Sequence, residues 1–162
     1  MNLYGIVIFT LRAAVFAAIV CGLYALTLKL RGKQLSAGRL IAVFYIASLI
    51  EITVLRSGVL WNSLYDAKRL AVQWIPLKTT VNEFKAGVWP FIYHVAGNLA
   101  WFVPLGLIMR RKRAFTALLA SVLTSAVIEC LQWVCITGVT DIDDIILNTC
   151  GTMIGYWLSR KI

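Results

Sequence analysis

The sequence predicts an all-α protein, a polytopic membrane helix bundle of about five transmembrane helices forming one domain over residues 1–162. Three observations predict this fold. The chain is 60% hydrophobic and 14% charged, and its mean hydropathy of +0.82 exceeds that of ordinary soluble domains. Apolar runs of roughly 20 residues, the length that crosses a bilayer as a helix, recur along the chain. Basic residues gather in short clusters between these runs, as in the loops of membrane proteins.

The expected spans are bounded by charged or polar residues. Between the second and third spans, residues 57–89 are polar and aromatic, which is typical of a segment at the level of the lipid headgroups. A sixth span would have to cross within this stretch, where no uncharged run is long enough. In chain order, the five spans cover about residues 5–28, 40–55, 90–109, 114–136 and 144–159.

Lysine and arginine orient the predicted bundle. The segments after the first and third spans and the C-terminal tail hold most of them, and the opposite side holds fewer. The positive-inside bias therefore places the N-terminus outside and the C-terminus in the cytoplasm. The net charge of +9 does not indicate nucleic-acid binding, because no basic helix with interleaved aromatic residues is present. The four scattered cysteines have no metal-ligand spacing, so we expect neither a metal nor a cofactor.

Residues 125–155 carry the most informative pattern. Four of the seven acidic residues lie here, inside or beside apolar runs. Ionisable groups in membrane spans are costly and usually face the protein interior or a wet cavity, so they mark a functional site. Helical rise places the polar residues between the membrane midplane and the outer surface. We therefore expect an outward-facing polar cavity that binds a ligand through Asn98, Glu129, Gln132, Asp141, Asp144 and Asn148, with Arg12 and Arg56.

Each of these features also has a structural explanation. Thr140, Asp141 and Asp143 can cap the last helix, and the two asparagines can form hydrogen bonds between helices. Arg12 can extend to the membrane surface without a partner. The lone His94 is expected at the surface. Gly151 and Gly155 have the spacing of a close helix–helix contact.

Three blocks of the sequence resemble the VanZ-like family, named for a protein associated with resistance to the glycopeptide teicoplanin. The first is Asn98-Leu99-Ala100-Trp101-Phe102-Val103-Pro104-Leu105-Gly106, and the second is the Glu129-x-x-Gln132 pair. The third runs from Asp141 through Asp144, Asn148 and Gly151 to Gly155. The blocks cover residues 98–155 in the family's order and spacing. Val139 stands where many members carry Arg, so a basic partner for the acidic residues is either absent or supplied by Arg12 or Arg56.

The resemblance implies a multi-pass protein of the bacterial cytoplasmic membrane that lowers susceptibility to teicoplanin-type antibiotics. Its mechanism stays open between two hypotheses. In the first, the polar cavity binds an envelope lipid or a lipid-linked precursor, and Arg12 and Arg56 contact its phosphate. In the second, the protein is an enzyme that modifies such a lipid, with Glu129 as acid/base and Asp141 or Asp144 positioning the substrate or a divalent cation. We favour the first, because the chain has no known catalytic motif. A purely structural bundle is a third alternative.

Overall fold

The computed structural model describes residues 3–55 and 71–161. Within these residues it contains six α-helices, a short 3-10 helix and one pair of two-residue strands, which confirms the all-α prediction. The chain forms two compact units, residues 1–59 and 60–162. The expectation of a single domain over 1–162 stays a prediction. Arg56 lies outside the described residues.

The first unit is a pair of antiparallel helices, α1 (Leu3–Leu30) and α2 (Ala37–Thr53). Helix α1 ends in a glycine cap. Gly32 adopts a positive φ of 62°, and the Lys33 N–H donates back to the Leu28 carbonyl at 2.9 Å, which satisfies a carbonyl that the last turn leaves free. The pair is also joined at its other end, where the Arg12 side chain donates to the Leu55 carbonyl at 3.1 Å.

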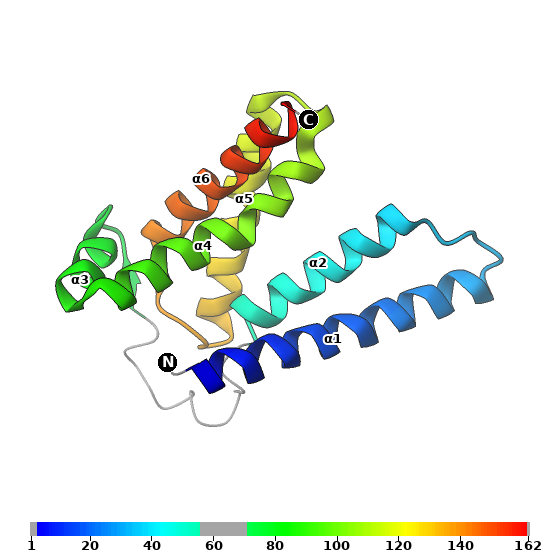
Figure 1. Cartoon of the computed structure of the whole chain (residues 1–162), viewed down its shortest axis with the longest axis horizontal. Coiled ribbons are helices and arrows are strands. Elements are labelled where there is room, and N and C mark those ends of the chain that lie inside the picture. The colour runs from blue at the N-terminus through cyan, green and yellow to red at the C-terminus, as the bar shows by residue number, and fades with distance from the viewer. Residues whose placement is uncertain (1–2, 56–70, 162) are drawn as a thin grey trace. The chain divides into compact units, whose positions relative to one another are not determined.

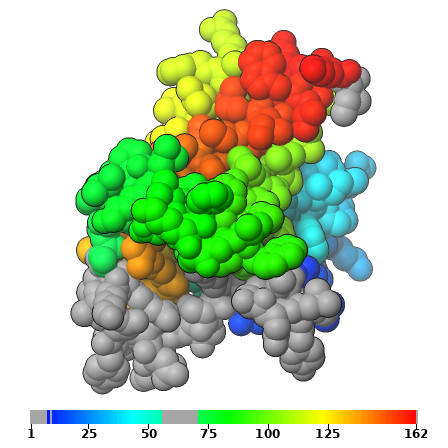
Figure 2. Space-filling view, turned by 60° about the vertical axis from the view of Figure 1, so that its left-hand side comes forward, coloured from blue at the N-terminus to red at the C-terminus, as the bar shows by residue number. Residues whose placement is uncertain are grey.

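The second unit is organised around α6, which packs against both α4 and α5 (Figure 1). The strands β1 (Val72–Gln73) and β2 (Thr140–Asp141) pair in parallel, and β2 leads directly into α6. Helix α3 packs against α4, and together they form one continuous surface (Figure 2). In chain order the helices are α3 (Lys78–Ala86), α4 (Val88–Ile108), the 3-10 turn η2 (Met109–Arg111), α5 (Ala114–Val134) and α6 (Ile142–Ser159).

The long helices agree closely with the predicted spans. Three described segments are long and apolar enough to cross a membrane: Thr10–Leu30, Val88–Arg111 and Ala114–Val134. Helix α2 has 17 residues, and α6 (18 residues) contains several polar side chains; neither is among the three segments that are long and apolar enough. The count of five spans and their orientation therefore stay predictions.

Helices α4 and α6 approach each other so closely that their backbones touch. A Cβ built on Gly151 would lie 2.3 Å from the Leu99 carbonyl oxygen, and one on Gly155 would lie 2.0 Å from that of Val103. On α4, a Cβ on Gly106 would lie 2.0 Å from the Thr152 carbonyl oxygen. Only glycine fits at such distances, so the predicted close-packing role of Gly151 and Gly155 is confirmed.

Candidate functional site

The residues around the first turn of α6 form a polar cluster that draws on four helices. It is called here the α6 cluster. Carboxylates in the first turn of a helix are favoured because the N-terminal end carries a partial positive charge. The three aspartates of this turn nevertheless contact different neighbours and have different exposures. The members of the cluster are Thr80, His94, Asn98, Glu129, Asp141, Asp143 and Asp144.

Asp141 and Glu129 together hold the turn that leads into α6. The Asp141 side chain accepts the N–H of Asp143 at 2.9 Å and caps the helix. The Asp141 N–H in turn donates to Glu129 Oε2 at 2.8 Å. The Thr140 hydroxyl donates to the Glu129 carbonyl at 3.4 Å. Both carboxylates are buried, so the capping interpretation of Asp141 is confirmed, and the Glu129 carboxylate binds a backbone amide.

Asp143 caps a different helix, α3, from the side. Its carboxylate is fully buried and accepts hydrogen bonds from the backbone N–H groups of Leu77 and Thr80. It also accepts one from the Thr80 hydroxyl at 3.0 Å. The first N–H groups of a helix have no partner within the helix. The α3 N-terminus obtains its partner from α6, and Leu77 takes a left-handed conformation with φ 62° at this point.

Asp144 is the most accessible carboxylate of the turn. Its side chain is 24% exposed, and Oδ1 accepts the Asn98 amide of α4 at 2.7 Å. His94, one helical turn before Asn98, places Nδ1 3.8 Å from the same oxygen and Nε2 3.4 Å from the Thr80 hydroxyl. Because that hydroxyl donates its one hydrogen to Asp143, it can accept a hydrogen bond from His94.

A second polar group continues along α6 toward the middle of the helix. Asn148 is buried and donates to the Ser125 hydroxyl of α5 at 2.8 Å. Ser121 donates to the Thr152 hydroxyl at 2.7 Å. Hydrogen bonds between helices through small polar side chains stabilise membrane bundles. Asn148 therefore forms the hydrogen bond between helices that the sequence offered as its structural explanation. Gln132 is buried on the same side of α5 as Glu129.

Arg12 is engaged within the first unit. Its Nε lies 2.6 Å from Glu51 Oε1, and the Glu51 side chain is only 7% exposed. The arginine therefore pairs with a buried carboxylate on α2, so the interpretation that Arg12 extends to the surface without a partner is wrong. A role of Arg12 and Arg56 in binding a phosphate stays a prediction.

The sequence of this chain also matches a known family over most of its length. The sequence model of the VanZ/LLP1 family matches residues 42–162. The chain belongs to this family. No curated protein and no solved structure matches it significantly. Together with the three long apolar helices, membership indicates that the chain is a membrane protein.

The family match contains the whole α6 cluster and both helices of the glycine contact. The resemblance to VanZ-like sequences noted from residues 98–155 is thus confirmed, and the match extends to α2 in the first unit. His94 was expected at the surface, and no role was predicted for Thr80. The structure places both in the α6 cluster, with the His94 side chain only 14% exposed. The four-residue spacing of His94 and Asn98, which puts them on one face of α4, was the available signal.

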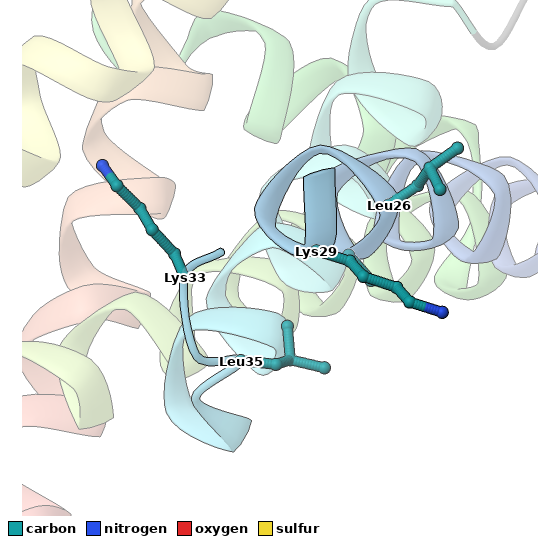
Figure 3. A pocket seen from close by; sticks show the side chains of 5 residues that line it. Leu26, Lys29, Lys33 and Leu35 are labelled. Atoms are coloured by element: carbon teal, nitrogen blue, oxygen red, sulfur yellow. The ribbon is translucent and has the colours of Figure 1, made fainter. Parts of the chain in front are cut away.

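Two hollows on the described surface lie away from the α6 cluster. One is at the end of α1, lined by Ala25, Leu26, Lys29, Lys33 and Leu35 (Figure 3). The other follows α6 toward its C-terminus, along Cys150, Ile154 and Trp157. Both are mainly apolar. The described residues contain no group of three or more His, Cys, Asp and Glu side chains that could hold a metal ion. The predicted outward-facing polar cavity stays a prediction.

Proposed function

We propose that this VanZ/LLP1-family protein spans the bacterial cytoplasmic membrane five times and binds the polar headgroup of an envelope lipid or lipid-linked precursor. In this proposal the α6 cluster faces the outer side of the membrane. Binding there lowers susceptibility to teicoplanin-type antibiotics, because it changes what a lipid-anchored drug meets at the outer surface.

The observation that carries the proposal is that the carboxylates of the α6 cluster differ in burial and in hydrogen-bond partner. Asp141, Asp143 and Glu129 are buried and accept backbone N–H groups. Asp144 instead remains partly exposed, beside the Asn98 amide and the His94 ring. These three side chains offer acceptors and donors at one place, which is what orients a polar headgroup. A carboxylate kept partly accessible in a membrane protein supports a binding role.

Native mass spectrometry of the protein extracted with its lipids tests the proposal. A phosphate-bearing lipid should co-purify, and Asp144→Ala or Asn98→Ala should reduce the fraction of lipid-bound protein. Asp141→Asn is the matched control, because asparagine caps a helix about as well as aspartate. Lipid occupancy that stays unchanged in both alanine variants would exclude Asp144 and Asn98 as the groups that bind the headgroup. In the same strains, teicoplanin susceptibility should rise with the loss of lipid.

The enzyme hypothesis and the binding hypothesis predict different effects of substituting Glu129. In the structure its carboxylate accepts the Asp141 N–H, and a glutamine carbonyl can accept that bond as well. We therefore expect Glu129→Gln to keep the resistance phenotype and Glu129→Leu to lose it with the fold of the α5–α6 turn. Loss of the phenotype in Glu129→Gln, with unchanged thermal stability, would instead support acid/base chemistry.

A further inference from the structure

Helix α3 exposes a stripe of apolar side chains along one face. Val81 and Phe84, three residues apart, share this face, and Phe84 is 63% exposed. Leu77 just before the helix and Val88 just after it are also exposed. Side chains as large as these normally lie in a core. An exposed row of them indicates contact with a partner or with lipid.

The remaining faces of α3 follow the pattern of a helix that lies along a membrane surface. Lys78 and Lys85, seven residues apart, form an exposed basic row beside the apolar stripe, and the exposed Asn82 lies beyond it. Thr80 and Glu83 are half-buried on the side turned toward the protein. An apolar face bordered by lysines is typical of helices that bind anionic lipid surfaces.

The apolar stripe continues onto a helix that is long enough to cross the membrane. Trp89 and Ile92, in the first two turns of α4, are exposed next to Val88. The rings of Phe84 and Phe91 meet edge-to-face with centroids 5.4 Å apart, which fixes α3 against α4. Figure 2 shows the two helices (green) as a continuous surface. A surface shared with a membrane-crossing helix is exposed to the same lipid.

The position of α3 is also fixed at its other end. Asp143 binds the backbone N–H groups of Leu77 and Thr80 at the N-terminal end of α3, so the helix is attached to α6 at this end and to α4 through Phe84. We propose that α3 is an interfacial helix of this protein. Its apolar stripe inserts among the lipid chains of the adjacent leaflet, and Lys78 and Lys85 bind anionic phospholipid headgroups. This inference does not depend on headgroup binding at Asp144.

Site-specific fluorescence in vesicles tests this inference. The full chain, with its cysteines replaced by serine, carries a polarity-sensitive label at Phe84→Cys or, in a second variant, at Val81→Cys. It is reconstituted into phosphatidylcholine vesicles with or without phosphatidylglycerol. Both labels should emit at a shorter wavelength than the same label at Asn82→Cys. They should be quenched by spin-labelled lipid chains rather than by aqueous iodide. A label at Asn82→Cys is the matched control and should be quenched by iodide.

The basic row is tested by Lys78→Gln with Lys85→Gln in the Val81→Cys background. Phosphatidylglycerol should increase quenching by spin-labelled chains in the parent and have little effect in the double variant. Iodide quenching at Val81→Cys and Phe84→Cys equal to that at Asn82→Cys would overturn the proposal. The labels could instead lose their protection from iodide when fewer protein molecules are placed in each vesicle. That result would show that a second copy of the chain covers the apolar stripe, and it would also overturn the proposal.

Discussion

At the scale of single residues, neighbouring carboxylates of identical chemistry have different roles because they face different elements. Asp141 caps its own helix, whereas Asp143 caps α3 and Asp144 contacts α4. A charged acceptor strengthens its hydrogen bonds to backbone N–H groups. Such bonds are costly to lose when the site is buried, since the freed groups have no water to replace the partner.

Asp143→Asn should therefore lower the stability of the protein. An asparagine side chain presents an NH₂ group in place of one carboxylate oxygen, so it faces at least one of the donors from Leu77 and Thr80 with another donor. We expect a loss of about 1–3 kcal/mol in the free energy of unfolding. Chemical denaturation in detergent, followed by circular dichroism, measures it.

Asp141→Asn is the control for this prediction, because asparagine caps helices as well as aspartate does. Its stability should stay close to that of the parent protein. Equal losses in the two variants would show that the effect comes from the removal of a negative charge, and not from the loss of the Asp143 hydrogen bonds to the N-terminal end of α3.

At the scale of secondary-structure elements, the contact between α4 and α6 is decided by backbone approach. Lipid chains are as apolar as leucine, so helices in a bilayer gain little from burying large apolar side chains. Close packing of glycine faces replaces that driving force, and it also brings carbonyls and small polar groups within reach of each other. The Thr152 hydroxyl, which donates to the Asn148 carbonyl at 3.1 Å in this region, is one result.

Gly151→Ala and Gly155→Ala should each separate α4 from α6. The added methyl group would overlap the backbone of Leu99 or Val103, and overpacking of this kind costs about 1–3 kcal/mol. Thermal unfolding in detergent should show a lower midpoint for both variants. Gly97→Ala on α4 provides the control, since nothing lies within 4 Å of its built Cβ. A drop in stability for Gly97→Ala as large as for Gly151→Ala would contradict a role for backbone approach.

At the scale of the whole molecule, the two units differ in what holds them together. In the first, α1 and α2 are joined by the Arg12–Glu51 ion pair. The second is held by the glycine contact and by the α6 cluster. Near the basic residues that follow α4, the Tyr156 hydroxyl donates to the Lys112 carbonyl at 2.9 Å. This hydrogen bond fixes the C-terminal half of α6 to the turn after α4. Lys112 belongs to the basic cluster that sets the predicted orientation.

Reporter fusions test this orientation in cells. A reporter that fluoresces only in the cytoplasm, fused after Arg113 or after Ile162, should be active at both positions. A reporter enzyme that works only outside the cytoplasm, fused after Gly87, should be active as well. Activity of the cytoplasmic reporter after Gly87 would reverse the topology and place the α6 cluster on the cytoplasmic side.

The sequence alone determined the long helices, the membrane class and the family, but it did not predict α3 (Lys78–Ala86), which lies in the stretch expected only to be polar and aromatic. Apolar periodicity and length are local properties, so the boundaries of α4, α5 and α6 could be predicted to within a few residues. The motif of residues 98–155 likewise identified Asn98, Glu129, Asp144 and Asn148 as polar groups of interest.

Only the tertiary structure decided which partner each of these groups has. Nothing local to Asp143 indicates that it caps a helix 63 residues earlier, and nothing near Arg12 indicates that it pairs with Glu51. Such pairings depend on how helices distant in sequence pack, and in the second unit that packing includes the close approach of α4 and α6 at their glycines. The packing of the second unit buries Glu129 of α5 and Asp141 and Asp143 of the α6 turn in structural hydrogen bonds, and it leaves Asp144 partly exposed.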